Sequence, residues 1–209
     1  MSYYSVCLDM TGRFTVVIGG GTVAERKVQG LLDAGAAVTV ISPHLTEQLV
    51  RWEKKERIEH VARSYRPGDL AGYELAFVAT DDPEINAAVF HEGKMRGLWV
   101  NAADDPAHCD FILPSVLRRG ELMIAVSTGG KSPALARAIR EELESYFTSD
   151  YGTLSKVVAA VRKQLRQRAV KPSLEAWHDA LNGQLRVLVQ RGDLIGAKTY
   201  LLHRLEGKA

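Results

Sequence analysis

Three successive glycines, Gly19 to Gly21, separate an apolar run at residues 14–18 from a helical pattern that follows them. A strand, a tight glycine turn and a helix in this order are typical of a dinucleotide-binding fingerprint. Gly19 permits the turn, Gly21 lets the backbone approach a pyrophosphate, and the small Ala24 lets the helix pack closely on the strand. The pattern therefore predicts that a phosphate binds at the helix N-terminus.

The residues after the second strand bear on which dinucleotide binds. Such a strand usually ends in Asp or Glu, whose carboxylate binds the ribose hydroxyls, but here it ends in Ser42-Pro43-His44. This position therefore leaves the choice between NAD and NADP open. No arginine stands there to bind a 2′-phosphate, which favours NAD as the cofactor.

Acidic residues follow two further strands. In an open parallel sheet, ligands bind at the carboxyl ends of the strands, which places Thr80-Asp81-Asp82 and Asp104-Asp105 on the cofactor side. We expect Thr80 and Asp81 to contact the cofactor, although an Asp before Pro83 is also a routine helix cap. Asp104 is the candidate catalytic residue, because its carboxylate could accept a proton beside the nicotinamide; a local turn is the alternative interpretation.

The segment from Ser127 to Pro133 carries two glycines, a lysine and hydroxyl groups just before a helical pattern. Backbone N–H groups and the helix dipole could bind an anion there, so the segment is a candidate seat for a carboxylate or a phosphate. A hairpin-to-helix turn capped by Ser132 explains the same residues without a ligand. The Gly-x-x-x-x-Gly-Lys spacing of a phosphate loop is absent, which argues against NTP hydrolysis.

Composition disfavours several classes of protein. The six histidines and the two cysteines, Cys7 and Cys109, show no metal-binding or disulfide spacing, which predicts no bound metal and a cytoplasmic protein. No segment approaches the roughly 20 apolar residues that cross a bilayer, so no membrane association is expected. The net charge of +2 divides into −5 for residues 1–150 and +7 for residues 151–209. Because the basic tail is not interleaved with aromatic residues, we expect no nucleic-acid partner.

An α/β fold is expected to position these residues. Apolar runs predict parallel strands at residues 14–18, 37–41, 58–61, 75–79 and 98–101, with further helices near residues 45–55 and 83–96. Strands that alternate with helices in this way predict a Rossmann-like parallel sheet. We assign residues 1–113 to this NAD-binding domain.

After Pro114 the pattern changes to a β-hairpin followed by helices. Runs at residues 115–117 and 122–127 flank a predicted short turn from Arg118 to Glu121, and a helix follows with Ser132 as its N-cap. From Leu154 onward the chain is predicted to be all-helical, with two apolar stripes separated by Lys171-Pro172-Ser173. The first stripe is Leu154, Val157, Val158, Val161 and Leu165, and the second is Leu174, Trp177, Leu181, Leu185 and Leu188.

Five segments, taken in this order and spacing, resemble the precorrin-2 dehydrogenases of siroheme biosynthesis. They are residues 19–27 (GGGTVAERK), 79–82 (ATDD), Asn101 with 104–106 (DDP), 111–115 (FILPS) and 126–137 (VSTGGKSPALAR). The resemblance spans essentially the whole chain and implies NAD-dependent oxidation of precorrin-2 to sirohydrochlorin. It also implies a homodimer formed through a dimerisation region at 114–150, and a helical C-terminal domain at 151–209 that helps to enclose the tetrapyrrole.

The resemblance also assigns roles to single residues. The family's essential aspartate matches Asp104, and its cofactor contacts match Thr22, Val23, Pro43 and His44. A serine that lies near the substrate in some relatives matches Thr128, which keeps the hydroxyl and adds a methyl group. In some members the same site also inserts iron into sirohydrochlorin.

Basic residues after Pro114 fit a polyanionic tetrapyrrole, whose carboxylates need cationic partners. The predicted substrate-binding residues are Arg118, Arg119, Thr128, Gly129, Lys131 and Arg137. Two alternatives stay open: a bifunctional dehydrogenase and ferrochelatase with ferrous ion as a second substrate, and a non-catalytic NAD-sensing module. The sensor would use the glycine turn without needing Asp104.

Overall fold

The computed structural model describes residues 3–103 and 105–207. The chain divides into two compact units, residues 1–113 and residues 114–209. Among the described residues, no helix combines the length and the apolar character needed to cross a bilayer.

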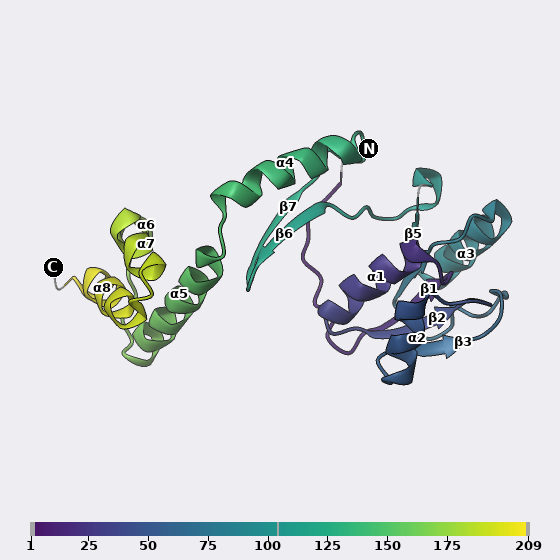
Figure 1. Ribbon diagram of the computed structural model, residues 1–209, viewed down its shortest axis with the longest axis horizontal. Coiled ribbons are helices and arrows are strands. Elements are labelled where there is room, and N and C mark those ends of the chain that lie inside the picture. Colours follow the sequence, from purple (N-terminus) through teal and green to yellow (C-terminus); the bar gives the residue numbers. More distant parts are fainter. Residues whose placement is uncertain (1–2, 104, 208–209) are drawn as a thin grey trace. The chain divides into compact units, whose positions relative to one another are not determined.

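The first unit is built on one sheet of five parallel strands in the order β3-β2-β1-β4-β5 (Figure 1). The strands are β1 (Phe14–Ile18), β2 (Ala37–Ile41), β3 (Glu59–Val61), β4 (Leu75–Val78) and β5 (Trp99–Ala102). The helices are α1 (Thr22–Asp33), α2 (Glu47–Lys54) and α3 (Pro83–Arg96), and a short 3-10 turn, η1 (Pro106–His108), follows β5. The predicted Rossmann-like α/β fold is confirmed, with strand and helix ends displaced from their predicted positions by at most two residues.

Both faces of this sheet are covered, which explains why its central strands read as continuous apolar runs. Side chains of a strand alternate between the two faces, so neighbouring residues enter different cores. Val17 and Phe77 pack with α1 and α2, whereas Val16 and Val78 pack with α3. The strands are thus packed into a core on each face, and these cores position the carboxyl ends of the strands and the loops that follow them.

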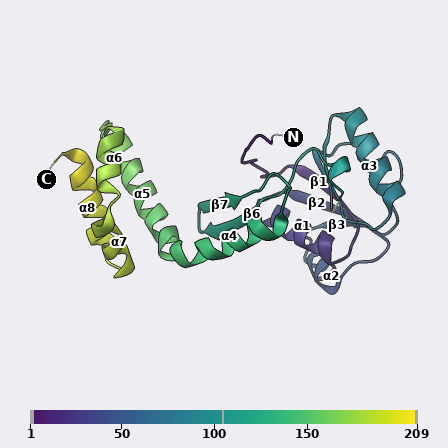
Figure 2. The same ribbon diagram turned by 90° about the horizontal axis from the view of Figure 1, so that it is seen from above.

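The second unit consists of a two-stranded antiparallel hairpin and five helices (Figure 2). The hairpin strands are β6 (Ser115–Arg119) and β7 (Leu122–Val126). The helices are α4 (Pro133–Tyr146), α5 (Asp150–Gln167), α6 (Leu174–Ala180), α7 (Gly183–Gln190) and α8 (Leu194–Glu206). Helix α4 runs along the hairpin, and α5, α7 and α8 pack together around a core that includes Val161, Leu185 and Leu201.

Two sequence predictions for this unit are wrong. Arg118 and Arg119 belong to β6, not to the turn, because the ladder continues to the Arg119–Leu122 pair and leaves only Gly120-Glu121 to reverse the chain. The predicted second apolar stripe is divided between α6 and α7. Asn182 ends the continuity, because its side chain accepts a hydrogen bond from the Leu185 N–H (3.3 Å) and so caps a new helix.

Candidate functional site

The glycine turn after β1 is shaped by contacts that exclude a side chain at its first two positions. Gly19 has φ +113°, and a Cβ built there would lie 2.2 Å from the Ala79 carbonyl oxygen. A Cβ on Gly20 would lie 2.0 Å from the His44 carbonyl oxygen, and the Thr46 N–H donates to the Gly20 carbonyl (3.0 Å). Both glycines are therefore required by the packing of the turn against neighbouring backbone. Sequence reasoning assigned no role to Gly20.

Gly21 differs from its two neighbours because the space around it is open. A Cβ at Gly21 would meet no atom within 4 Å, and its backbone is extended, with φ −83° and ψ −171°. Gly21 is the N-cap of α1, and no side chain caps this end of the helix. The helix therefore begins with backbone N–H groups that no side chain caps, as an anion-binding helix N-terminus requires.

The next three residues follow the predicted division between exposed and packed positions. Thr22 is exposed, Val23 is half-buried and Ala24 is fully buried in the core between α1 and the sheet. The small Ala24 thus does what the fingerprint predicts, since it lets the helix approach the strand closely.

Pro43 and His44, after β2, are both exposed beside the turn, because Gly20 packs against the His44 backbone. Ser42 is buried, and its hydroxyl donates to the His44 carbonyl oxygen (2.8 Å). The Ser42 carbonyl is in turn 2.9 Å from Nε2 of His60 on β3. These bonds fix the shape of the segment and leave the outer surfaces of Pro43 and His44 free to contact a ligand.

The Thr80-Asp81-Asp82 segment after β4 combines a helix cap with an exposed carboxylate. Asp82 accepts hydrogen bonds from the N–H groups of Glu84 (2.9 Å) and Ile85 (3.2 Å), so the capping interpretation is confirmed for Asp82. The Thr80 hydroxyl donates to Oδ1 of Asn86 (3.1 Å). Asp81 is exposed, and its contact with a cofactor stays a prediction.

The strand registers bring the predicted cofactor residues to one edge of the sheet. Ile18 pairs with Ile41 and with Val78, and Val78 pairs with Ala102. The residues that follow these positions, all at the carboxyl edge, are Gly19, Ser42, Ala79 and Ala103. The catalytic candidate Asp104 lies outside the described residues; Ala103 before it donates through its N–H to the Val78 carbonyl (2.8 Å).

An acid–base pair follows directly on this edge. Oδ2 of Asp105 is 2.6 Å from Nδ1 of His108, and the His108 ring contacts the Phe90 ring edge-on, with 5.2 Å between ring centroids. Across residues 3–103 and 105–207, His, Cys, Asp and Glu side chains form no group of three or more that could hold a metal ion.

In the second unit, the hydroxyl groups of the predicted anion seat form hydrogen bonds to the backbone of their own loop. The Thr128 hydroxyl donates to the Ser132 carbonyl (3.0 Å) and accepts from the Ser132 N–H (2.9 Å). The Ser132 hydroxyl accepts from the Leu135 N–H (3.2 Å), so Ser132 caps α4 as predicted. Gly129 and Lys131 are exposed. The loop is thus built by local hydrogen bonds, and a bound anion there stays a prediction.

The three predicted arginines of this unit have different surroundings. Arg118 is exposed on β6, whereas Arg119, on the opposite face of the strand, donates from Nε to the Phe147 carbonyl (2.7 Å) after α4. Arg137 on α4 pairs with Glu141 one turn later, with 2.9 Å between Nε and Oε1. Because this pair is exposed, Arg137 can exchange its partner for a ligand carboxylate at little cost.

Comparison with known proteins identifies the family. Residues 6–115 match a family model described as "Putative NAD(P)-binding", and residues 119–146 match one described as "Sirohaem biosynthesis protein central". The solved structure of "SirC, precorrin-2 dehydrogenase" is 30% identical, has a TM-score of 0.78, and aligns over 95% of this chain and 100% of that chain. The chain belongs to the precorrin-2 dehydrogenase family.

Other members of the family are longer. A siroheme synthase of Photorhabdus laumondii is 36% identical over 99% of this chain and 44% of its own length. A siroheme synthase of Nitrosococcus oceani is 39% identical over 99% of this chain and 45% of its own length. The chain thus spans about half the length of the siroheme synthases that it matches.

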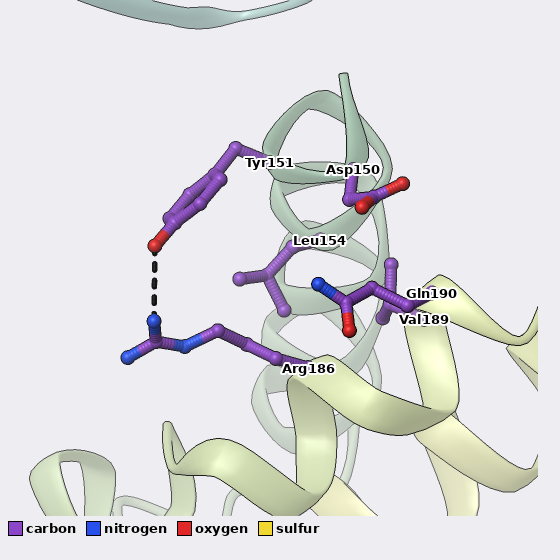
Figure 3. A pocket seen from close by; sticks show the side chains of 6 residues that line it. All are labelled: Asp150, Tyr151, Leu154, Arg186, Val189 and Gln190. Atoms are coloured by element: carbon purple, nitrogen blue, oxygen red, sulfur yellow. Dashed lines mark hydrogen bonds between the residues drawn. The ribbon is translucent and has the colours of Figure 1, made fainter. Parts of the chain in front are cut away.

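This precorrin-2 dehydrogenase family member also has a crevice between α5 and α7 (Figure 3). Six residues line it: Asp150, Tyr151, Leu154, Arg186, Val189 and Gln190. Nη1 of Arg186 on α7 donates to the hydroxyl of Tyr151 on α5 (3.0 Å), so this bond joins the two helices. Since none of the six is a predicted site residue, we assign the crevice to the packing of the helices.

Proposed function

We propose that this chain oxidises precorrin-2 to sirohydrochlorin with NAD, in siroheme biosynthesis. The observation that supports the proposal is the N-terminus of α1, which no side chain caps, at the same sheet edge as the end of β5, the strand that precedes Asp104 in the sequence. The family membership and the full-length match to a precorrin-2 dehydrogenase support it.

The residues at the carboxyl edge fit a dinucleotide. Bound there, NAD would supply the acceptor for a hydride. The backbone of Gly19, Gly21, Thr22 and Val23 would hold the pyrophosphate, since the space over Gly21 is empty and no side chain competes for the helix N–H groups. Pro43 and His44 would contact the adenosine side, with Thr80 and Asp81 on the neighbouring strand.

Asp104 would act as the general base. Oxidation removes a hydride and a proton, and the proton needs an acceptor at the site where the hydride leaves. β5 lies two strands from β1, so position 104 follows a strand about 10 Å from the glycine turn at roughly 4.8 Å per strand. An extended dinucleotide bound at the turn can span this distance along the edge.

The substrate is a polycarboxylate, and the second unit supplies cations. Arg118 and Lys131 are exposed and Arg137 is held only by an exposed ion pair, so these three are the candidates for substrate carboxylates. Arg119 would contribute to substrate binding through its position in β6. Thr128 and Gly129 would contribute to substrate binding through the backbone of their loop.

We further propose that two copies associate through the hairpin. The hairpin contacts α4, and Leu117 is buried on one of its faces, while Val116, Arg118 and Ala125 are exposed on the other. A two-stranded hairpin is marginally stable by itself and gains from further pairing. Sedimentation velocity tests the dimer, and a monomer at micromolar concentration contradicts it.

Both cysteines are free, in agreement with a reducing cytoplasm.

The deciding experiment is an anaerobic assay of purified protein with precorrin-2 and NAD. Sirohydrochlorin should appear only with NAD, and Asp104→Asn should lower turnover by about 10²–10⁴-fold while NAD still binds. Asp33→Asn, at the exposed opposite end of α1, is the matched control and should be unchanged. If Asp104→Asn retains full turnover, Asp104 is not the base; if wild type gives no product, the proposed reaction is wrong and the NAD-sensing alternative gains.

The same assay tests the bifunctional alternative. Ferrous ion is added after the oxidation is complete, and siroheme formation is compared with the rate in buffer alone. Acceleration that Asp104→Asn abolishes assigns metal insertion to this site as well, and a rate equal to that in buffer restricts the chain to oxidation.

A further inference from the structure

The loop that carries position 104 leaves β5 and returns beside it. Asn101 on β5 forms an isolated antiparallel bridge with Cys109. One step further, the Asp110 N–H donates to the Val100 carbonyl (2.8 Å), and the Val100 N–H donates to the Asp110 carboxylate (3.0 Å). The two ends of the loop are thus joined to the same short stretch of strand.

The Asn101 side chain links the returning end of the loop to the sheet and to α1. It is only 6% exposed, and its Nδ2 donates to the Phe111 carbonyl (2.8 Å) and lies 3.5 Å from the Cys109 sulfur. Its Oδ1 accepts from Nζ of Lys27 (3.4 Å). Because both the amide nitrogen and the carbonyl oxygen of the Asn101 side chain have hydrogen-bond partners, the carboxamide is held in a single orientation.

Cys109 connects the two sides of position 104. Its sulfur lies 3.1 Å from the Ala102 carbonyl oxygen and 3.3 Å from the Asp105 carbonyl oxygen, so both carbonyls are within reach of its single S–H donor. Burial raises the pKa of the Cys109 thiol, which keeps the proton on the sulfur. Asn101 and Cys109, with these contacts, are called the loop anchor below.

We propose that Asn101 is a positioning residue for the oxidation: together with Cys109 it fixes the backbone on both sides of Asp104 and so sets where that carboxylate meets the substrate. The inference rests on the proposed function. Asn101 does not reach the reacting atoms; it acts through Asp104. A misplacement of about 1 Å in a reacting group can cost about 10²-fold in rate, which is the size of effect a lost anchor should have.

The test compares Asn101→Ala with Cys109→Ala and Cys109→Ser. The control is Thr15→Val, which removes another buried polar side chain, bonded to the Ala37 carbonyl (3.1 Å), near the amino end of β1. Asn101→Ala should lower kcat by about 10²-fold with the Kd for NAD unchanged. Cys109→Ala should lower kcat by a smaller factor, and Cys109→Ser, which keeps a donor, should restore most of it. Thr15→Val should lower Tm without lowering kcat.

A second measurement separates positioning from general damage. In the Asp104→Asn background, removal of the anchor should cause no further loss, because the group that it positions has gone. If that background has no measurable turnover, the pH profile of kcat/KM decides: a displaced base moves the acid limb, whereas structural damage lowers the whole curve.

The inference is overturned if Asn101→Ala and Cys109→Ala both keep kcat within about twofold of Thr15→Val, or if their losses multiply with that of Asp104→Asn. Should Asn101→Ala fail to fold, Cys109→Ala against Cys109→Ser carries the same test. Failure of the proposed function is distinct, since wild type would then form no sirohydrochlorin.

Discussion

Gly21→Ala should abolish tight NAD binding without harming the fold. An added methyl group meets no atom within 4 Å, and the extended backbone at Gly21 suits any residue. Lower entropy of the unfolded chain favours alanine by about 0.4–1 kcal/mol. Alanine is a poorer N-cap than glycine by a similar amount, so the two effects nearly cancel. The free energy of unfolding should therefore stay within about 0.5 kcal/mol of wild type.

The loss of affinity follows from the same open space. If the pyrophosphate lies against the Gly21 backbone, the methyl group occupies its position and separates it from the helix N–H groups. A hydrogen bond to a charged group contributes about 1.5–3 kcal/mol, which corresponds to a rise in Kd of roughly 10–100-fold. Gly30→Ala is the matched control, because Gly30 lies in the same helix with nothing within 4 Å of an added Cβ. It should bind NAD normally.

Gly20→Ala should give the opposite pattern: it should destabilise the fold without abolishing NAD binding. Its methyl group would lie 2.0 Å from the His44 carbonyl oxygen, a backbone atom that cannot move without displacing the segment after β2. Overpacking of this kind costs about 1–3 kcal/mol, or roughly 2–12 °C in Tm for a chain of this size. Calorimetric titration measures the affinity for NAD, and thermal unfolding measures Tm.

Normal NAD affinity in Gly21→Ala would refute binding of the pyrophosphate at this turn.

Two further predictions concern the elements that support the site. Burial alone would raise the pKa of Glu92, but hydrogen bonds from Tyr65 (2.5 Å), Arg96 (2.6 Å) and two loop N–H groups hold it below its ordinary value. Glu92 therefore stabilises the fold fully at pH values above the ordinary carboxyl pKa, and this stabilisation should disappear as the pH falls through the lower pKa of the folded state. Glu92→Gln should lower the free energy of unfolding, measured with urea at pH 7, by about 1–3 kcal/mol. It should also make the free energy of unfolding less dependent on pH. Thr128→Val should destabilise the second unit by about 1 kcal/mol through loss of both bonds to Ser132, whereas Thr128→Ser should not.

The sequence predicted the first unit well because its signals are local. Buried parallel strands read as apolar runs, and a glycine turn with a following helix marks where the first one ends. The carboxyl edge then follows from topology alone, so residues as distant as Gly19 and Ala103 could be assigned to one edge. Helix caps such as Asp82 and Ser132 were also predicted, since a cap bonds N–H groups only two or three residues away.

The assignments that failed or were missed at Arg118, Arg119, Gly20 and Asn101 have a common cause in longer-range contacts. Arg118 and Arg119 resemble turn residues by composition, but their place in β6 is decided by pairing with the opposite strand. The role of Gly20 depends on a carbonyl oxygen 24 residues later, which no local pattern contains. No local pattern contains the loop anchor either, because Asn101 on β5 contacts Lys27 on α1 and Phe111 in the segment after η1.

The glycine turn shows why a motif match and a binding site are separate claims. Three adjacent glycines meet three different requirements: Gly19 needs a positive φ, Gly20 needs room for the His44 backbone, and only Gly21 is unconstrained by the protein itself. The packing of the protein sets no steric requirement for glycine at the third position. Glycine there, at a helix end that no side chain caps, is what the proposed contact with a pyrophosphate would require, because such a ligand must approach the backbone closely.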